Sequence, residues 1–255
     1  MRHGGTSPDG TRHQPHRRPT GAGVLPTAVL TALLTSSIAG CGTEEAGTAA
    51  PTAPAGSASA TATPSATPSV DTRAVVLGDS YTVGLGSAGE VGYVEALAAQ
   101  MDWTVVRAGE SGTGYVNPSG VDGQSVYGDR VDQVAAASPS VVLVQGSTND
   151  VGFASAAAVG DAAQAMYGAL QESLPDARIV VVGPLDAPTV DRASVTAVRD
   201  ELAAAAAAAG LPFIDPIAES WLEDEELYAD GLHPDDEGYL AFAADLAEEL
   251  RELGF

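Results

Sequence analysis

Short apolar runs of three to six residues recur along the chain from residue 74 onward. They are rich in Val and do not alternate with polar residues, which is typical of strands buried on both faces of a parallel sheet. The predicted strands are residues 74–77, 103–107, 140–145, 178–182 and 212–214.

Stretches with helical patterning separate these runs. The clearest helix follows Asp235, which can cap it, because Asp236 and Glu237 then fall in the first turn. Its apolar stripe comprises Tyr239, Phe242, Ala243, Leu246, Leu250 and Leu253. The other predicted helices are residues 92–101, 125–137, 155–173 and 192–209.

Strands that alternate with helices predict one three-layer α/β domain with a parallel sheet, over residues 71–255. A chain of about 185 residues can bury one sizeable core but not two. In sheets of this class, ligands bind beyond the carboxyl ends of the strands. The residues that follow each strand are therefore the candidates for chemistry.

The part before this domain has a different composition. Residues 1–40 combine a basic start with an apolar stretch that ends in Ile-Ala-Gly before Cys41, which is similar to a bacterial lipobox. We expect residues 1–40 to be a lipoprotein signal peptide and Cys41 to carry lipid. An uncleaved membrane anchor is the alternative. Residues 41–70, almost all Ala, Thr, Pro, Ser and Gly, are expected to be a disordered tether.

The net charge excludes some classes of binding partner. The chain has a net charge of −23, and without the four Arg and one Asp of residues 1–40 the remainder carries −26 and no Lys. Such a surface excludes nucleic-acid binding and repels anionic lipid, so we expect membrane contact through the lipid anchor only. The predicted location is extracytoplasmic, at the cell membrane or secreted. A single Cys excludes a disulfide scaffold and a thiolate zinc site.

Polar residues at the predicted strand ends carry a possible reaction centre. Ser80 follows the first strand, and His233 is the only histidine after residue 16. A serine hydroxyl needs a base to become a nucleophile, and histidine suits neutral pH. Asp230, three residues before His233, can orient the imidazole. The backbone N–H of Gly112 and the amide of Asn149, after the second and third strands, can stabilise an oxyanion.

In this order, the blocks Gly78-Asp79-Ser80, Gly109-Glu110-Ser111-Gly112, Ser147-Thr148-Asn149-Asp150 and Asp230-Gly231-Leu232-His233 resemble the SGNH (GDSL-type) hydrolase family. The resemblance covers essentially residues 73–255. It implies a flavodoxin-like sheet of five parallel strands in the order 2-1-3-4-5. It further implies a serine esterase with Ser80 as nucleophile, His233 as base and Asp230 as third member. The oxyanion hole would comprise the N–H groups of Ser80 and Gly112 and the Asn149 side chain, with no cofactor and no metal.

The chain departs from the family's pattern at two points, and two acidic residues beside the site are expected to have structural roles. The family's third block usually begins with Gly, whereas Ser147 stands there in this chain. Either Gly109 or Gly112 can be the oxyanion glycine, and the Ser-Gly context favours Gly112. We expect Asp79 and Asp150, beside the site, to brace loops.

Alternatives remain for the function. The expected substrate is a small-molecule or glycan ester, and carbohydrate O-acetylesterase is the narrower alternative for the activity. The expected oligomeric state is a monomer. A non-catalytic binding lipoprotein with the same fold is the rival from another class. The G-x-G-x-x-G of residues 84–89 predicts no dinucleotide site, because residues 78–83 separate it from the strand. The acidic segment 219–226, with Trp221, is interpreted as solvated surface rather than a rim loop.

Overall fold

The computed structural model describes residues 72–255. The predicted signal peptide (1–40), the tether (41–70) and the lipidation of Cys41 lie outside the described residues and stay predictions.

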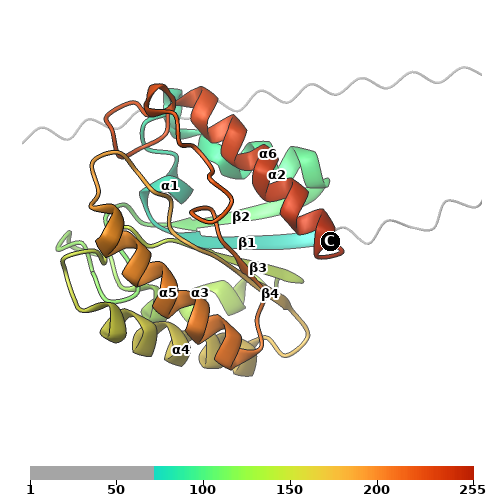
Figure 1. Ribbon diagram of the computed structural model, residues 1–255. Helices are drawn as coiled ribbons and strands as arrows, with labels where there is room; N and C mark the ends of the chain where they lie inside the picture. The colour runs from blue at the N-terminus through green and yellow to red at the C-terminus, as the bar shows by residue number, and fades with distance from the viewer. Residues whose placement is uncertain (1–71) are drawn as a thin grey trace, which may run out of the picture. The chain divides into compact units, whose positions relative to one another are not determined.

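Within residues 72–255 the strands form one five-stranded parallel sheet (Figure 1). The strand order is β2-β1-β3-β4-β5, which confirms the order that the family resemblance implied. Every pairing between neighbours is parallel. The strands are β1 (Thr72–Gly78), β2 (Trp103–Gly109), β3 (Val141–Gln145), β4 (Arg178–Val182) and β5 (Phe213–Ile214).

Helices cover both faces of the sheet, and the strand side chains divide between the two layers. Ala74 and Val76 of β1 belong to one apolar core, and Val75 and Leu77 belong to the other. Because both faces are buried, β1 has apolar residues at all four positions 74–77, as its unbroken run indicated. Figure 1 shows one layer formed by α2 (Gly92–Met101) and α6 (Asp236–Glu252) and the other by α3 (Val131–Ala136), α4 (Ala156–Ser173) and α5 (Arg192–Ala209).

The long helices begin at side-chain caps. Asp235 accepts a hydrogen bond of 2.9 Å from the Gly238 N–H and so starts α6, as predicted. Asp191 caps α5 through the Ser194 N–H at 2.9 Å. At the other end of α5, Gly210 takes a left-handed conformation that Ala could adopt only with strain.

Two predictions about local structure are wrong. The helix predicted over residues 125–137 is a 3₁₀ helix, η2 (Tyr127–Arg130), followed by the short α3. Val126 has an extended backbone, with a ψ of 158°, so the helix cannot include residues 125 and 126. The N–H groups of Ser125 and Tyr127 bond to Glu110 and Gly114 of a preceding loop, which holds this segment in place.

The interpretation of residues 219–226 as solvated surface is wrong for Trp221. Its side chain is buried, and its ring centroid lies 5.7 Å from that of Phe242 in α6. The burial of Trp221 was missed because the surrounding run of carboxylates dominates the local sequence pattern.

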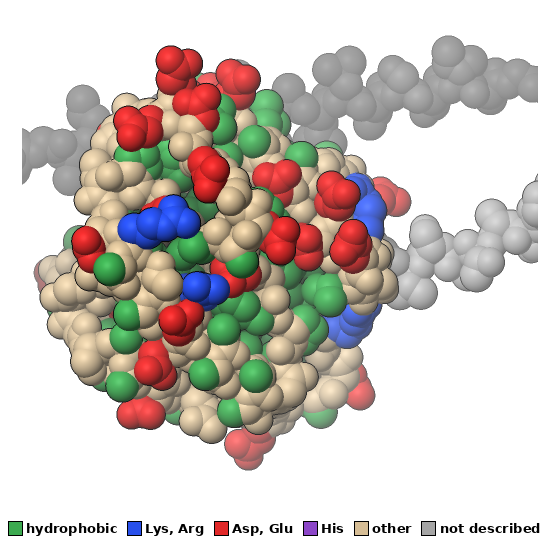
Figure 2. All heavy atoms as spheres, viewed as in Figure 1, with side chains coloured by type: hydrophobic (Ala, Val, Ile, Leu, Met, Phe, Trp, Pro, Cys, Tyr) green, Lys and Arg blue, Asp and Glu red, His purple; other side chains and the backbone are tan. Residues whose placement is uncertain are grey.

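The outer surface is acidic. Figure 2 shows Asp and Glu side chains spread over the face in view, among few Arg side chains. In residues 72–255, no helix has the length and apolar character that crossing a bilayer requires.

Candidate active site

Ser80, His233 and Asp230 form one hydrogen-bonded chain at the carboxyl edge of the sheet. The Nε2 atom of His233 lies 3.1 Å from the Ser80 hydroxyl oxygen. The Nδ1 atom of the same ring lies 2.8 Å from Asp230 Oδ2. The structure thus joins Ser80 to His233, 153 positions away in sequence, and to Asp230, in the geometry that a nucleophile, a base and an orienting carboxylate require.

A tight turn explains why Asp230 precedes His233 by three residues. Asp230 Oδ1 accepts hydrogen bonds from the N–H groups of Leu232, at 3.0 Å, and His233, at 2.8 Å. Its other oxygen is then free to meet the imidazole of His233. Partial burial raises the pKa of Asp230, but the bonds from His233 and Leu232 outweigh it and lower the pKa to about 2. The carboxylate is therefore ionised at neutral pH.

Residues from two other segments hold this turn. The Tyr81 hydroxyl donates to the Leu232 carbonyl at 2.6 Å, and its ring meets the His233 ring edge-on at 5.9 Å between centroids. Thr189, after β4, donates to the Gly231 carbonyl through both its N–H and its hydroxyl, each at 3.0 Å. Sequence reasoning missed Tyr81 and Thr189, because each acts on a backbone carbonyl that no pattern locates.

Gly86, part of the G-x-G-x-x-G segment, lies directly against the histidine. A Cβ atom built on it would come within 2.8 Å of the His233 Cβ and 2.5 Å of the Pro234 carbonyl oxygen. Its φ of +100° also disfavours any other residue. This glycine therefore serves the packing of the histidine turn.

Ser80 begins the short helix α1 (Ser80–Val83), and Asp79 caps it. Asp79 Oδ1 accepts a 2.9 Å hydrogen bond from the Tyr81 N–H, and its side chain is almost completely buried. Burial raises the pKa of Asp79 to about 6, although the bond from Tyr81 partly offsets the effect. A carboxyl group with an unusually high pKa thus stands next to the serine.

The loop after β2 contains a β-turn that presents Gly112. The Thr113 N–H bonds to the Glu110 carbonyl at 3.3 Å, and Gly112, third in the turn, has a φ of +78°. A positive φ at that position is the reason that a glycine stands there. Among the described residues, neither the Gly112 N–H nor the Ser80 N–H has a hydrogen-bond acceptor.

Gly109, the alternative oxyanion glycine, has a packing role. It ends β2, and a Cβ atom on it would come within 2.9 Å of the Val83 nitrogen in α1. Its place against the α1 backbone explains the glycine without any role in catalysis. The geometry therefore favours Gly112 as the donor.

Asn149 links the loop after β2 to the serine turn. Its amide nitrogen donates to the Thr113 carbonyl at 2.9 Å and lies 3.4 Å from Asp79 Oδ2. The departure at Ser147 has not displaced the amide, which still lies between the two segments.

Asp150, next in sequence, is fully buried and braces the same loop, as predicted. Its carboxylate accepts three backbone hydrogen bonds of 2.8–3.1 Å, from Tyr115, Val116 and Asn117. Burial raises its pKa, and these three bonds act in the opposite direction.

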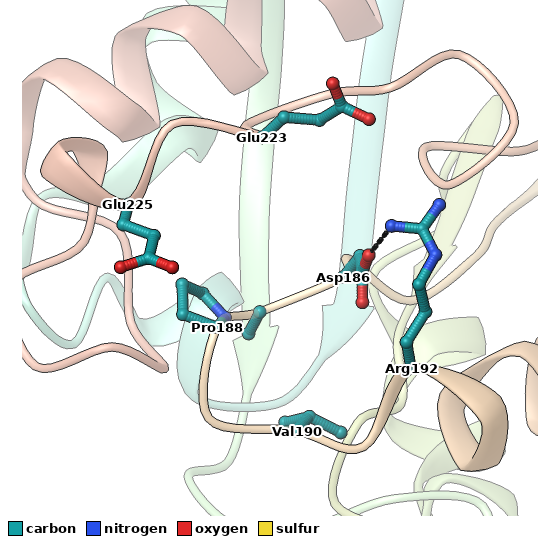
Figure 3. A pocket seen from close by; sticks show the side chains of 7 residues that line it. Asp186, Pro188, Val190, Arg192, Glu223 and Glu225 are labelled. Carbon is teal, nitrogen blue, oxygen red and sulfur yellow. Dashed lines mark hydrogen bonds and ion pairs between the residues drawn. The ribbon is translucent and has the colours of Figure 1, made fainter.

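A pocket of about 410 Å³ adjoins the segment that supports the histidine turn (Figure 3). Its walls come from the loop around Thr189 and from the segment that carries Glu223 and Glu225. Arg192 forms an ion pair with Asp186 in the wall of the pocket. Its positive charge is thereby neutralised and does not balance the charges of Glu223 and Glu225. The pocket is consequently unfavourable for anions.

Comparisons with known proteins agree with this site. Residues 76–241 match the model of the GDSL-like lipase/acylhydrolase family. GDSL lipase Rv0518 of Mycobacterium tuberculosis is 31% identical over 184 residues, covering 68% of this chain and 78% of the relative.

Solved structures share the fold at lower identity. The carbohydrate acetylesterase Est24 of Sinorhizobium meliloti superposes with a TM-score of 0.60 at 15% identity, over 71% of this chain and 99% of that one. The aryl esterase of M. smegmatis gives 0.59 at 19% identity, with the same coverage of both chains. With the family match over residues 76–241, the chain belongs to the GDSL-like lipase/acylhydrolase family and is an SGNH-type serine ester hydrolase.

Proposed function

We propose that this protein is an extracytoplasmic acylhydrolase that cleaves carboxylic esters through an acyl-enzyme on Ser80. The observation that carries the proposal is the continuous chain from Asp230 through His233 to the Ser80 hydroxyl, with contacts of 2.8 and 3.1 Å. An arrangement without chemistry would not need an ionised carboxylate, an imidazole and a hydroxyl in this order.

Acylation begins with the Ser80 hydroxyl. His233 Nε2 accepts its proton while Oγ attacks the carbonyl carbon of the ester, and Asp230 stabilises the imidazolium that forms. Collapse of the tetrahedral intermediate breaks the bond to the alkoxy oxygen, which takes the proton from His233. The alcohol leaves, and the acyl group remains on Ser80.

The oxyanion of the intermediate needs donors that are in place before the reaction. The N–H groups of Ser80 and Gly112 suit this role because neither has another acceptor in residues 72–255. The amide of Asn149 adds a third donor. Its 3.4 Å contact with Asp79 is long for a hydrogen bond, so that hydrogen is available to the oxyanion.

Deacylation repeats these steps with water. His233 accepts a proton from a water molecule, whose oxygen attacks the acyl carbonyl, and the proton then returns to Ser80 Oγ as the acid leaves. This cycle uses only groups of the protein itself and water. We therefore expect chelators to leave the rate unchanged.

The substrate class follows from charge and from the relatives. Glu223 and Glu225 near the histidine turn disfavour an anionic substrate group. Relatives of the same fold include a carbohydrate acetylesterase and an aryl esterase, so neutral small-molecule esters and acetylated glycans are the candidates. Among these, carbohydrate O-acetylesterase is the narrower proposal.

The location follows from the sequence before residue 71. We propose that residues 1–40 direct export, that Cys41 carries lipid, and that residues 41–70 tether a monomeric domain to the membrane. The tether then lets the site reach esters at some distance from the bilayer.

A fluorophosphonate labelling experiment tests the mechanism. The reagent should modify Ser80, and Ser80→Ala and His233→Ala should each abolish both labelling and hydrolysis of p-nitrophenyl acetate. Ser220→Ala, at an exposed serine outside the site, is the matched control and should behave as wild type. Labelling of a different serine, or full hydrolysis by His233→Ala, would mean that the mechanism is wrong. A protein that neither labels nor hydrolyses would favour the binding lipoprotein.

A substrate series separates the candidate classes. Aryl esters of increasing acyl length should be compared with acetylated glycans at equal concentrations of titrated sites. A kcat/KM at least tenfold higher for the glycans would support O-acetylesterase activity, whereas the reverse order would point to small-molecule esters.

A further inference from the structure

Arg130 is a buried cation below the candidate site. It ends η2, its side chain is 3% exposed, and its guanidinium lies over the Tyr127 ring at 4.8 Å from the centroid. Its closest carboxylate is that of Glu110, at 3.9 Å from Nε. Burial lowers the pKa of Arg130, and the charge nonetheless has to be compensated inside the protein.

The guanidinium bonds to two chain segments at once. Nη1 donates to the carbonyls of Gly78, at 3.1 Å, and Ala108, at 2.9 Å, where β1 and β2 end. Nη2 donates to the Thr113 hydroxyl at 3.1 Å. Gly78 stands two residues before Ser80, and Thr113 directly follows Gly112. One side chain therefore connects the serine segment to the oxyanion turn.

The Thr113 hydroxyl extends this chain of hydrogen bonds into the turn around Gly112. It donates to the Glu110 carbonyl at 2.6 Å, the same carbonyl that closes the turn around Gly112. Glu110 in turn accepts the Ser125 N–H at 2.8 Å, which ties the far end of the loop. A shift of the Arg130 head group would thus move the Gly112 peptide.

We propose that Arg130 is a positioning residue for ester hydrolysis, which fixes the Gly112 N–H relative to Ser80 by bridging their segments. This inference rests on the proposed function. It assigns Arg130 no contact with substrate. Oxyanion donors act through being aligned in advance, so a loosened bridge costs transition-state stabilisation and leaves ground-state binding nearly unchanged.

Lys cannot replace this side chain. The contacts to Gly78, Ala108 and Thr113 use two nitrogens of the planar guanidinium, whereas the three N–H donors of an ammonium group lie on a single nitrogen. Arg130→Lys keeps the charge and loses the bridge. It should lower kcat about 10- to 100-fold, less than the ~10²–10³-fold cost of deleting an oxyanion donor, with KM within twofold of wild type.

The matched control is Arg178→Lys. Arg178 also donates to two backbone carbonyls, of Leu253 and Gly254, but it begins β4 at the opposite edge of the sheet. Both variants of the full chain are assayed with p-nitrophenyl acetate, and fluorophosphonate labelling run to completion counts the folded sites. Arg178→Lys should keep its kcat per labelled site. An equal kcat per labelled site in Arg130→Lys and wild type would overturn the inference.

A second pair of variants covers the case in which Arg130→Lys fails to fold. Thr113→Val removes the acceptor for Arg130 at nearly constant volume, and Thr113→Ser retains the hydroxyl. Thr113→Val should lose kcat at unchanged KM, and Thr113→Ser should preserve it; equal kcat values for the two would refute the bridge. Wild type that labels at Ser80 keeps the proposed function intact whatever these variants show.

Discussion

Replacing Asp79 by Asn should stabilise the protein at neutral pH and much less at acid pH. Asp79 is 2% exposed, and burial raises the pKa of its carboxyl group from 3.8 to about 6. Asn can still cap α1 by accepting the Tyr81 N–H, because both residues are good N-caps. The substitution therefore removes a buried charge and leaves the cap.

The size of the effect follows from proton linkage. Since the pKa of Asp79 is higher in the folded state, the folded state binds this proton more tightly. Its stabilising contribution is complete below pH 3.8 and is lost as the pH rises through about 6. Each unit of difference is worth about 1.36 kcal/mol, so the full loss is about 3 kcal/mol, of which about 2 kcal/mol falls between pH 4.5 and 7.5.

Urea unfolding at these two pH values measures the effect. The stability gained by Asp79→Asn should be about 2 kcal/mol larger at pH 7.5 than at pH 4.5. Asp132→Asn, at an exposed carboxylate of α3, controls for the loss of one negative charge. A gain that differs by less than about 0.5 kcal/mol between the two pH values would refute the burial argument.

Three shorter predictions concern the site and the anchor. Asp230→Asn should lower kcat about 10³- to 10⁴-fold in the p-nitrophenyl acetate assay, since the imidazole loses its orienting carboxylate; a loss below tenfold would contradict the proposed triad. Gly109→Ala should cost about 1–3 kcal/mol in urea unfolding, because its Cβ meets the Val83 backbone, and no loss would contradict the close packing. Cys41→Ala should move the protein from the membrane to the soluble fraction with unchanged kcat, and retention in the membrane would indicate an uncleaved anchor.

The strands of the sheet were predictable because strands buried on both faces appear in the sequence as unbroken apolar runs. The apolar runs at β1, β2 and β4 begin or end within two residues of the observed strands. The strand order is different: no local pattern encodes which strands are neighbours, and the order came from the resemblance alone. The helix predicted from residue 125 was wrong at its start, because Ser125 bonds to Glu110 in the loop after β2, a contact that no local pattern indicates.

The candidate site likewise contains residues that the sequence predicts and residues that it does not. Ser80, Asn149 and His233 could be selected because their side chains have the required chemistry and follow strands, whose carboxyl ends meet at one edge. Tyr81 and Arg130 could not, since their hydrogen bonds go to carbonyls and a hydroxyl in remote segments. Sequence thus indicates groups that react more readily than groups that hold them in place.

The arginines show how this acidic protein uses its few cations. Of the seven Arg in residues 72–255, six donate to a carbonyl or a carboxylate of the chain itself: Arg107, Arg130, Arg178, Arg192, Arg199 and Arg251. Each of these charges is engaged with a loop, a helix end or an acidic partner, and Figure 2 shows few Arg side chains among the Asp and Glu side chains of the face in view. Carboxylates set the surface potential of residues 72–255, so we expect this domain to repel phosphate groups and anionic lipid. A lipid on Cys41, as proposed, would supply an attachment to the membrane that does not depend on this charge.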